Sequence, residues 1–220
     1  MLTIHAHLSR FFIILITFLS FQQGLNGQFL SYDTYGYIID NPHIQSLSLT
    51  NIGWMFSNTD YMANWHPLTW LSYAIEYHFF ALNPFGYHVV GLVFHILNAL
   101  LVFQLTIQLI LLDAYYQKRE QILTHAILFA AALAASLFAI HPQRVESVIW
   151  IAERKDVLCQ FFSLLTLISY LNYAKALQTK WYIISLIFFS FALMSKAMAI
   201  TLPAILILLD FYAHASKFFS

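Results

Sequence analysis

The chain has 220 residues, of which 60% are hydrophobic and only 9% are charged, and its formal net charge is +0. Soluble domains carry roughly 25% charged residues, so this composition predicts an integral membrane protein. The ten basic residues are scattered and create no basic field, which argues against nucleic acid as a partner. The lone cysteine, Cys159, excludes an internal disulfide and a cysteine-based metal cluster.

Six apolar segments predict an all-α fold with about six transmembrane helices in a single membrane domain, 1–220. The segments cover residues 6–23, 88–112, 121–140, 157–174, 181–195 and 197–213. A bilayer core requires about 20 helical residues, so the last two segments have the length of broken or re-entrant helices. In the first segment Arg10 precedes the apolar run, as in a signal peptide. We interpret it as a retained span, because no small-residue cleavage site follows.

The charge distribution orients these segments. Residues 24–87 contain four carboxylates and neither Lys nor Arg; the carboxylates are Asp33, Asp40, Asp60 and Glu76. Short cytoplasmic loops concentrate Lys and Arg, so this base-free segment is predicted to be the first outer loop, with the N-terminus in the cytoplasm. The second outer loop is predicted at about 141–156. This topology leaves four bases on the outer side: Arg144, Arg154, Lys155 and Lys196.

The first outer loop is dense in Tyr and Trp, and three Pro residues divide it. Aromatic residues with a polar tip favour the membrane interface, so Leu68–Leu82 is predicted to form a helix on the membrane surface. Pro67 suits the first turn of this helix, and the sequence 83–86 is expected to end it. The loop is therefore predicted to form a compact cap at the membrane.

Several ordered motifs carry a resemblance to one family. The first outer loop contains FLSYD at 29–33, DNPHI at 40–44, NWHPLTWLSY at 64–73 and LNPFGYH at 82–88. Further on the chain contains HPQRVESV at 141–148, WIAERKDVL at 150–158, SKAM at 195–198, TLP at 201–203 and LLD at 208–210. Over nearly its whole length the chain resembles bacterial relatives of the transmembrane and tetratricopeptide-repeat protein O-mannosyltransferases, which are C-type glycosyltransferases.

This resemblance implies a membrane enzyme of the bacterial cytoplasmic membrane. Such an enzyme transfers a sugar, here a mannose-like hexose, from a polyprenyl-phosphate carrier to a protein hydroxyl on the outer face. The expected partners are membrane lipid, the lipid-linked sugar and an acceptor protein. We expect no cofactor beyond that donor, and the need for a divalent metal stays open.

Two departures from the family pattern keep alternatives open. The family usually has a second acid where this chain has Thr34, and it continues into further spans and helical repeats, whereas this chain ends at Ser220. The alternative function is a truncated, inactive membrane fragment with a packing or scaffolding role, and a companion subunit is a candidate source of the missing repeats. A transporter is disfavoured, because the middles of the spans are nearly free of charge.

Asp33 and Lys196 are the leading candidates for the chemistry. Sugar transfer to a hydroxyl needs a general base and positive groups that hold the leaving phosphate. Asp33, soon after the first span, is the candidate base, and the alternative is a helix or turn cap. Lys196 separates two short apolar segments, where an unpaired ammonium is costly. It is therefore predicted to contact the carrier phosphate, the alternative being a snorkelling lysine.

The segment 144–158 supplies further candidates. As one continuous helix it would place Glu146 and Glu153 on one face, with Arg144 and Lys155 on another. We predict that its three bases bind the carrier phosphate, although mutual neutralisation of residues 153–156 on a solvated face is an equal alternative. These bases are Arg144, Arg154 and Lys155. Three residues are predicted to contact the sugar or the acceptor: Glu146, His66 and His141. For Glu146 the alternative is a helix-start residue, and for His66 it is a structural interface role.

The histidines do not indicate a metal site. The chain has no His-Glu-x-x-His pattern. His88 and His95 share a helical face with Gly91 and Asn98, which is typical of a close-packed seam between helices with polar hydrogen bonds.

Overall fold

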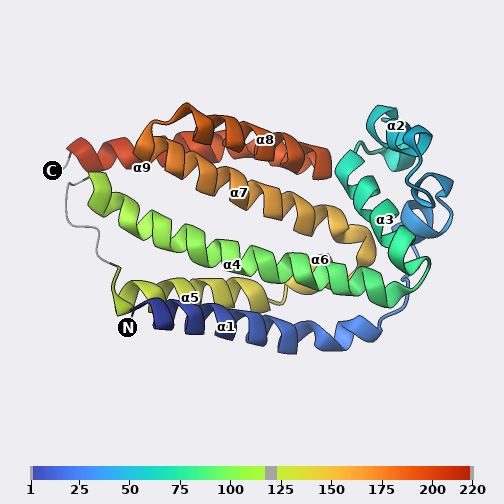
Figure 1. The fold of residues 1–220 in the computed structure, drawn as a ribbon, viewed down its shortest axis with the longest axis horizontal. Coiled ribbons are helices and arrows are strands. Elements are labelled where there is room, and N and C mark those ends of the chain that lie inside the picture. The colour runs from blue at the N-terminus through green and yellow to red at the C-terminus, as the bar shows by residue number, and fades with distance from the viewer. Residues whose placement is uncertain (1, 117–122, 219–220) are drawn as a thin grey trace.

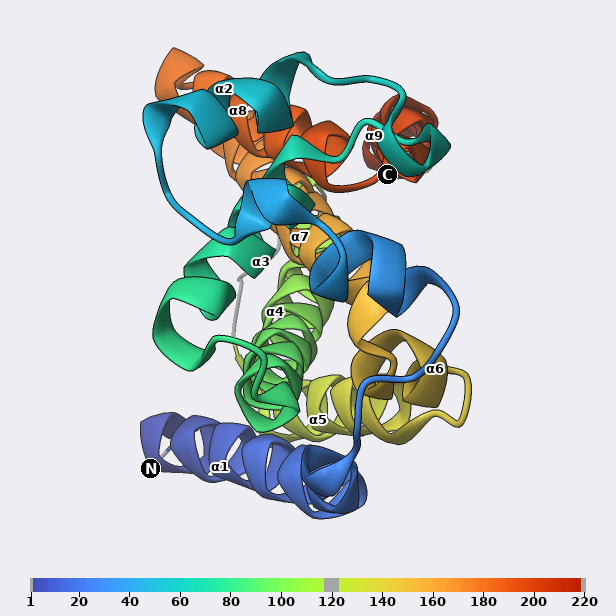
Figure 2. The ribbon, with the colours of Figure 1, turned by 90° about the vertical axis from the view of Figure 1, so that its right-hand side faces the viewer.

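The computed structural model describes residues 2–116 and 123–218, and every regular element within these ranges is helical. Six long helices run side by side, and shorter helices gather at one end of them (Figures 1 and 2). The six are α1 (Leu2–Phe21), α4 (Pro84–Tyr116), α5 (His125–Ile140), α7 (Arg154–Ala176), α8 (Thr179–Ser195) and α9 (Leu202–Phe218). Each coincides with one predicted apolar segment, and the all-α prediction is confirmed.

The six helices differ in their capacity to cross a membrane. Three segments are long and apolar enough to do so: Leu2–Asn26, Pro84–Leu112 and Ile151–Ala176. The other three are shorter apolar helices: His125–Ile140, Thr179–Ser195 and Ala197–Phe211. The 16 residues of α5 span about 24 Å, less than the roughly 30 Å of a bilayer core. The membrane class is therefore supported, and the count of six spans stays a prediction.

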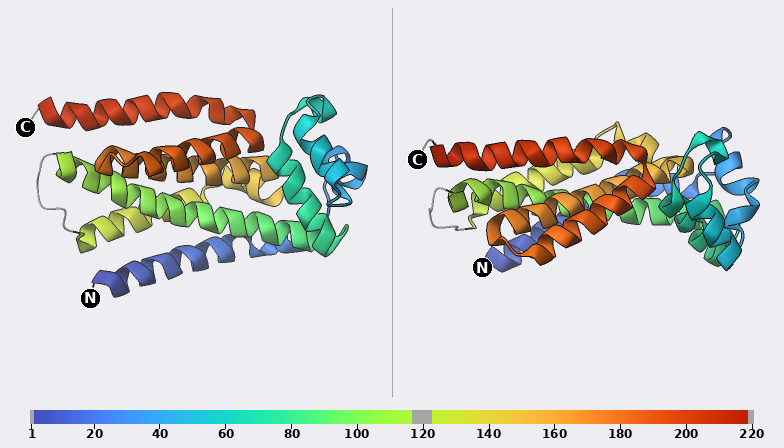
Figure 3. Two further views of the ribbon diagram at one scale, coloured as in Figure 1. Left: turned by 45° about the horizontal axis from the view of Figure 1, so that its top comes forward. Right: turned by 90° about the horizontal axis from the view of Figure 1, so that it is seen from above.

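Successive long helices alternate in direction, so the two predicted outer loops and Lys196 meet at one end of the bundle (Figures 1 and 3). Lys175 and Lys180 flank the turn at the opposite end, where both ends of the chain also lie. Lys118 and Arg119, which belong to the same predicted inner side, lie outside the described residues. The predicted outer loops and the lysines of the predicted inner side thus lie at opposite ends of the bundle, as the predicted topology requires. The side of a membrane that each end faces stays a prediction.

The cap comprises residues 27–83 and packs across one end of the bundle (Figure 1). Its elements are η2 (Tyr35–Ile39), η3 (Pro42–Ile44), α2 (Leu49–Ser57), η4 (Tyr61–Ala63) and α3 (Pro67–Phe80). Helix α3 occupies the predicted Leu68–Leu82 segment, and Pro67 lies in its first turn as expected. The helix ends at Ala81, whose φ of 48° lies in the left-handed region. Its position on a membrane surface stays a prediction.

Aromatic packing holds the cap together, and buried hydrogen bonds fix it to the bundle. Tyr37 stacks on Trp70 with 4.7 Å between ring centroids, and both side chains are buried beside Tyr73. The Tyr73 hydroxyl donates to the carbonyl of Ile151 at 2.8 Å. The hydroxyl of Thr69 donates to the carbonyl of Ser195 at 3.0 Å. Both bonds are buried, so α3 is held firmly against the ends of α7 and α8.

The expectation of one continuous helix over 144–158 is wrong. The chain forms α6 (Arg144–Ile149), the short η5 (Ile151–Glu153) and then α7, because Trp150 adopts an extended conformation (φ −78°, ψ 110°). The indole of Trp150 donates to the hydroxyl of Thr34 in the cap at 3.2 Å. This contact anchors the break. Glu146 is exposed while Glu153 is half-buried, and they do not share a helical face.

The chain forms the short helix η6 (Ala197–Thr201), and α9 begins at Leu202, so Pro203 lies in the first turn of α9. Proline is tolerated there because no intrahelical donor is lost.

The predicted polar seam lies between α4, α5 and α7. His95 Nε2 is 2.8 Å from the carbonyl of Ala139, and the Asn98 amide donates to the carbonyl of Val157 at 2.9 Å. A Cβ on Gly91 would lie 3.2 Å from the Val148 carbonyl oxygen, so the backbones approach closely there. The interpretation of these residues as a helix-packing seam is confirmed.

Candidate functional site

Two lysines and two carboxylates meet where the cap covers the bundle; we call these residues, Glu153, Lys155, Asp156 and Lys196, the lysine–carboxylate cluster. Lys196 Nζ donates to Asp156 Oδ1 and lies 3.6 Å from Glu153 Oε2. Lys155 Nζ lies 2.9 Å from Glu153 Oε1. Glu153 and Asp156 are three residues apart at the start of α7, so they point to the same side and receive Lys196 from the end of α8.

The cluster is enclosed but remains accessible. The side chains of Lys196 and Asp156 are 24% and 30% exposed, whereas that of Lys155 is 10% exposed. Burial alone would lower the pKa of Lys196, but Asp156 and Glu153 outweigh it, and the pKa is raised. Lys155 also lies 5.0 Å above the ring of Tyr37. Lys196 is therefore a charged ammonium that solvent and ligands can reach.

His66 borders this cluster from the cap. Its side chain is only 3% exposed, and its Nδ1 has no hydrogen-bond partner within the described chain. Burial lowers the pKa of His66 to about 4, and the charges of Lys155 and Lys196 act in the same direction. The imidazole is therefore neutral at pH 7, and a buried ring nitrogen is left to bond with a ligand.

Asp33 lies at the start of the cap and faces Tyr37. Burial, together with the charges of Asp33 and Glu153, raises the pKa of Tyr37 to about 12, so both carboxylates lie near this phenol. Across residues 2–116 and 123–218 the carboxylate of Asp33 makes neither a hydrogen bond nor an ion pair. Tyr37 is thus near Asp33 and also near Lys155 of the cluster. Thr34 is buried, and its hydroxyl accepts the bond from Trp150.

Arg154 belongs to a different environment. Its guanidinium lies 3.1 Å from Glu76 Oε2 and donates to the carbonyl of Tyr87 at 2.6 Å, and the Arg154 and Glu76 side chains are 1% and 3% exposed. Ser72 donates to the other oxygen of Glu76 at 2.8 Å. Burial raises the pKa of Glu76, while Arg154 and Ser72 act against that rise. This enclosed pair joins α3, α4 and α7; Nη1 of Arg154 is buried without a hydrogen-bond partner within the described residues, and phosphate binding by Arg154 stays a prediction.

Arg144 lies at the edge of the cluster. It donates to Gln160 at 3.3 Å, and its guanidinium lies 4.6 Å above the ring of Phe138. Burial lowers the pKa of Arg144, and the charge of Asp156 opposes this shift. The hydroxyl of Ser147 donates to Asp156 Oδ2 at 3.1 Å. Asp156 therefore stands between Arg144 and Lys196.

The other two predicted substrate residues lie outside this arrangement. His141 is exposed, and its Nδ1 accepts a bond from the backbone of Gln143 at 3.3 Å, which is a local turn contact. Glu146 is exposed on α6. Neither makes a described contact with the cluster, whereas His66, Lys155 and Lys196 come together in it.

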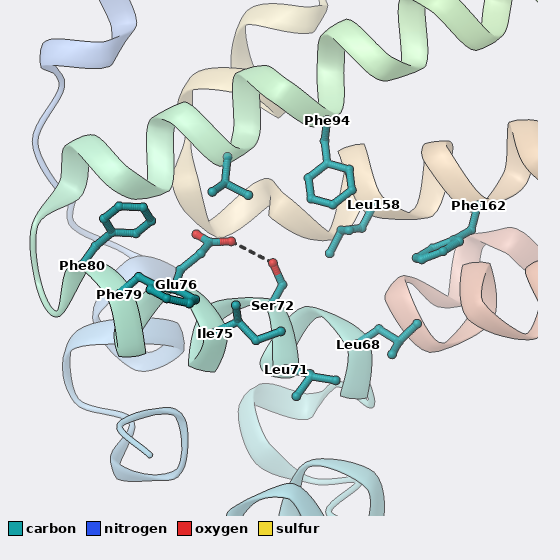
Figure 4. Close-up of a pocket in the computed structure, with 11 residues that line it drawn as sticks. Leu68, Leu71, Ser72, Ile75, Glu76, Phe79, Phe80, Phe94, Leu158 and Phe162 are labelled. Carbon is teal, nitrogen blue, oxygen red and sulfur yellow. Dashed lines mark hydrogen bonds between the residues drawn. The ribbon is translucent and has the colours of Figure 1, made fainter. Parts of the chain in front are cut away.

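An apolar groove of about 450 Å³ opens between α3 on one side and α4 and α7 on the other (Figure 4). Its walls include Leu68, Phe94, Leu158 and Phe162, and the bonded pair Ser72–Glu76 provides its polar point. Leu158 and Phe162 follow Lys155 by three and seven residues, so they share its side of α7. The residues that line the groove include Glu76, the partner of Arg154, and none of the four residues of the lysine–carboxylate cluster.

Sequence reasoning did not assign Glu153, Asp156, Tyr37 or Trp150 to the site. Glu153 and Asp156 are three residues apart in the sequence, on either side of Lys155. At the start of a helix this spacing directs both carboxylates to one side, so it could have indicated that they belong to the site. Tyr37 contacts Asn64 and Trp150 contacts Thr34, and in each case the two partners are 27 or more residues apart in the sequence. No local sequence pattern predicts either contact.

These features define an all-helical membrane protein with a lysine–carboxylate cluster beneath its cap and an apolar groove between α3, α4 and α7. The chain is similar to the human protein named protein O-mannosyl-transferase TMTC4, at 27% identity over 84% of this chain and 27% of that protein. A Caenorhabditis elegans protein named protein O-mannosyl-transferase F38B6.6 is 25% identical over 93% of this chain and 28% of its own length.

A third relative, named protein O-mannosyl-transferase Tmtc3, comes from Drosophila melanogaster and is 31% identical over 51% of this chain and 12% of that protein. The chain spans about a quarter of the length of the first two relatives. No family model and no solved structure matches the chain. The similarities over most of the chain support the O-mannosyltransferase resemblance seen in the sequence.

Proposed function

We propose that the chain forms the donor and base site of a membrane glycosyltransferase, which moves a mannose-like hexose from a polyprenyl-phosphate carrier to a protein hydroxyl. The relatives' names supply the reaction class. The observation that carries the proposal is the convergence of Lys155, Lys196 and His66, whose Nδ1 has no hydrogen-bond partner within the described residues, on a bundle end where Asp33 lies near Tyr37 and where α7 also lines an apolar groove.

The donor's two parts match the two parts of this region. The groove takes the prenyl chain, because each buried CH₂ contributes about 0.8 kcal/mol. Lys196 gives up its contact with Asp156 and binds the phosphate. Lys155, which contacts the other oxygen of Glu153, adds a second positive charge. Three bases (Arg144, Lys155, Lys196) minus two acids (Glu153, Asp156) leave one positive charge for the anion. Negative charge that develops on the leaving phosphate is stabilised by these fixed cations.

Asp33 acts as the base in this scheme. The acceptor hydroxyl oxygen attacks the anomeric carbon of the sugar, its proton passes to the carboxylate of Asp33, and the bond from the anomeric carbon to the phosphate oxygen breaks. The carboxylate is half-buried and makes no bond within the described residues, so it is available to an incoming hydroxyl. His66 offers its neutral ring nitrogen to the sugar or the phosphate.

The test is transfer from a polyprenyl-phosphate mannose to a Ser/Thr peptide by the purified chain in nanodiscs. Asp33→Asn should lower the rate by about 10²-fold or more, because the general base is lost. Asp60→Asn is the matched control, since Asp60 is an exposed acid of the same cap. Equal rates for Asp33→Asn and wild type would remove Asp33 from the mechanism.

One observation favours the alternative of an inactive fragment that packs or scaffolds. At the position where the resembling family has a second acid, Thr34 is buried in a bond to Trp150. The same assay separates the two functions. A folded wild-type chain that neither transfers sugar nor binds the carrier would establish the scaffolding role.

We also propose that the cap faces the outside of a bacterial inner membrane and that the N-terminus is cytoplasmic. Tyr32 in the cap is 86% exposed, and Leu177 at the opposite end is 75% exposed. In a Cys159→Ser background, Tyr32→Cys should react with a membrane-impermeant maleimide in intact cells, and Leu177→Cys only after lysis. The reverse pattern would overturn the orientation.

A further inference from the structure

The ammonium of Lys155 is held by three groups of different kinds. Its Nζ lies 2.9 Å from Glu153 Oε1 and donates to the carbonyl of Ala152 at 3.4 Å. It also lies over the ring of Tyr37, 5.0 Å from the ring centroid. An ammonium has three N–H groups, and a carboxylate, a carbonyl and an aromatic face satisfy one each. Lys155 therefore has one defined position, in contrast to the more exposed Lys196.

The Tyr37 ring is itself fixed within the cap. It stacks on Trp70 with 4.7 Å between ring centroids and 22° between ring planes, and Tyr73 meets it edge to face. Its hydroxyl accepts a hydrogen bond from the amide of Asn64 at 3.1 Å. Because aromatic packing and a hydrogen bond hold the ring, the ring is able to hold the lysine.

Burial makes the contact between ammonium and ring strong. A cation over an aromatic face is held more tightly when both are removed from water, and here Tyr37 is 1% and the Lys155 side chain 10% exposed. Without the ring, the flexible four-carbon stem of lysine would let the ammonium take several positions. The ring thus removes freedom that a phosphate would otherwise have to remove when it binds.

We propose that Tyr37 is a positioning residue, whose ring holds the ammonium of Lys155 in place so that the phosphate of a polyprenyl-phosphate donor meets a fixed positive charge. Fixed charges stabilise an anion without having to reorganise during the reaction. The inference rests on the proposed function of the lysine–carboxylate cluster, and it gives the cap a part in donor binding. Tyr37 acts only through Lys155 and does not touch the donor.

The test changes the charge of the aromatic face while its shape stays nearly constant. In the full chain, Tyr37 is replaced by Phe and then by phenylalanines of increasing fluorine content, which withdraw electrons from the ring. The Kd of a short-chain polyprenyl phosphate in nanodiscs should stay within about twofold for Tyr37→Phe and rise with fluorination to roughly tenfold. The matched control is the same series at Tyr61, which should leave Kd unchanged. Tyr61 packs edge to face on Trp70 in the same cap and has no cation over its ring within the described residues.

Two further measurements separate positioning from a merely structural role. In a Lys155→Met background the Tyr37 series should have no effect on Kd, because the ring has no ammonium to hold. In the absence of donor, Tyr37→Leu should increase the rate at which an amine reagent modifies Lys155, measured by mass spectrometry, whereas Tyr37→Phe should not.

The outcomes distinguish this inference from the function on which it rests. A wild-type chain that does not bind the carrier would overturn the phosphate site itself. Wild-type binding with the same Kd across the folded Tyr37 series would overturn the role of Tyr37 alone. Equal rises in Kd for the Tyr37 and Tyr61 series would show that the effect comes from the packing of the cap and would also overturn it.

Discussion

Arg154 and Lys155 are neighbours in the sequence, yet they lie in two regions of opposite character. Arg154 is enclosed with Glu76 between α3, α4 and α7, and its pair is almost wholly buried. Lys155 joins the lysine–carboxylate cluster, whose Lys196 and Asp156 are about a quarter exposed. Successive residues of a helix point about 100° apart, so one step along α7 changes the surroundings completely.

The comparison separates a buried ion pair from a pair that solvent can reach. The buried Arg154–Glu76 pair also bonds with Ser72 and the Tyr87 carbonyl, so it fixes α3 to the bundle. A partly exposed pair is worth little in stability, and its members can exchange one another for a ligand.

Removal of one partner from the buried pair should produce the largest loss of stability. Glu76→Ala leaves the Arg154 charge buried without its carboxylate, so the free energy of unfolding should fall by about 3–5 kcal/mol. Glu153→Ala should cost clearly less, since Lys196 keeps Asp156. Denaturant titrations in detergent, followed by tryptophan fluorescence, measure both. Equal losses in the two variants would break the distinction between the regions.

The dependence of the free energy of unfolding on pH, at acid pH, should reflect the protonation of His66. The folded-state pKa of about 4 is below the ordinary value of 6.5, so the unfolded state takes up a proton first as the pH falls. The associated stability is complete above pH 6.5 and is lost between about pH 6.5 and 4, by about 3 kcal/mol. His66→Gln should flatten this part of the wild-type profile. Superimposable profiles for the two proteins would contradict the buried, neutral imidazole.

The long helices were predictable because each carries a continuous apolar signal, and the start of α3 was predictable from Pro67. The break at Trp150 was not, because it depends on a bond to Thr34, 116 residues away. Lys196 stood out in the sequence as a charge between apolar segments, and the fold supplied its partners. The pairing of Arg154 with Glu76, 78 residues apart, has no local signal either.

A smaller effect should follow from the contact between the cap and α8. Thr69→Val removes the donor to the buried Ser195 carbonyl and should lower the free energy of unfolding by about 1–3 kcal/mol. Thr59→Val, at an exposed position of the cap, is the matched control and should be nearly neutral. The same titrations compare them. A Thr69→Val variant as stable as the control would show that this bond does not hold the cap.

The central claim, that the lysine–carboxylate cluster binds a lipid phosphate, is tested most directly by the equilibrium affinity of a short-chain polyprenyl phosphate for the full chain in nanodiscs. Lys196→Ala removes a charge-assisted hydrogen bond of about 1.5–3 kcal/mol and should raise Kd by at least roughly tenfold. Lys180→Ala, an exposed lysine at the opposite end, should leave Kd unchanged. A Lys196→Ala variant that is folded and binds as tightly as wild type would contradict the assignment of this cluster as the phosphate site.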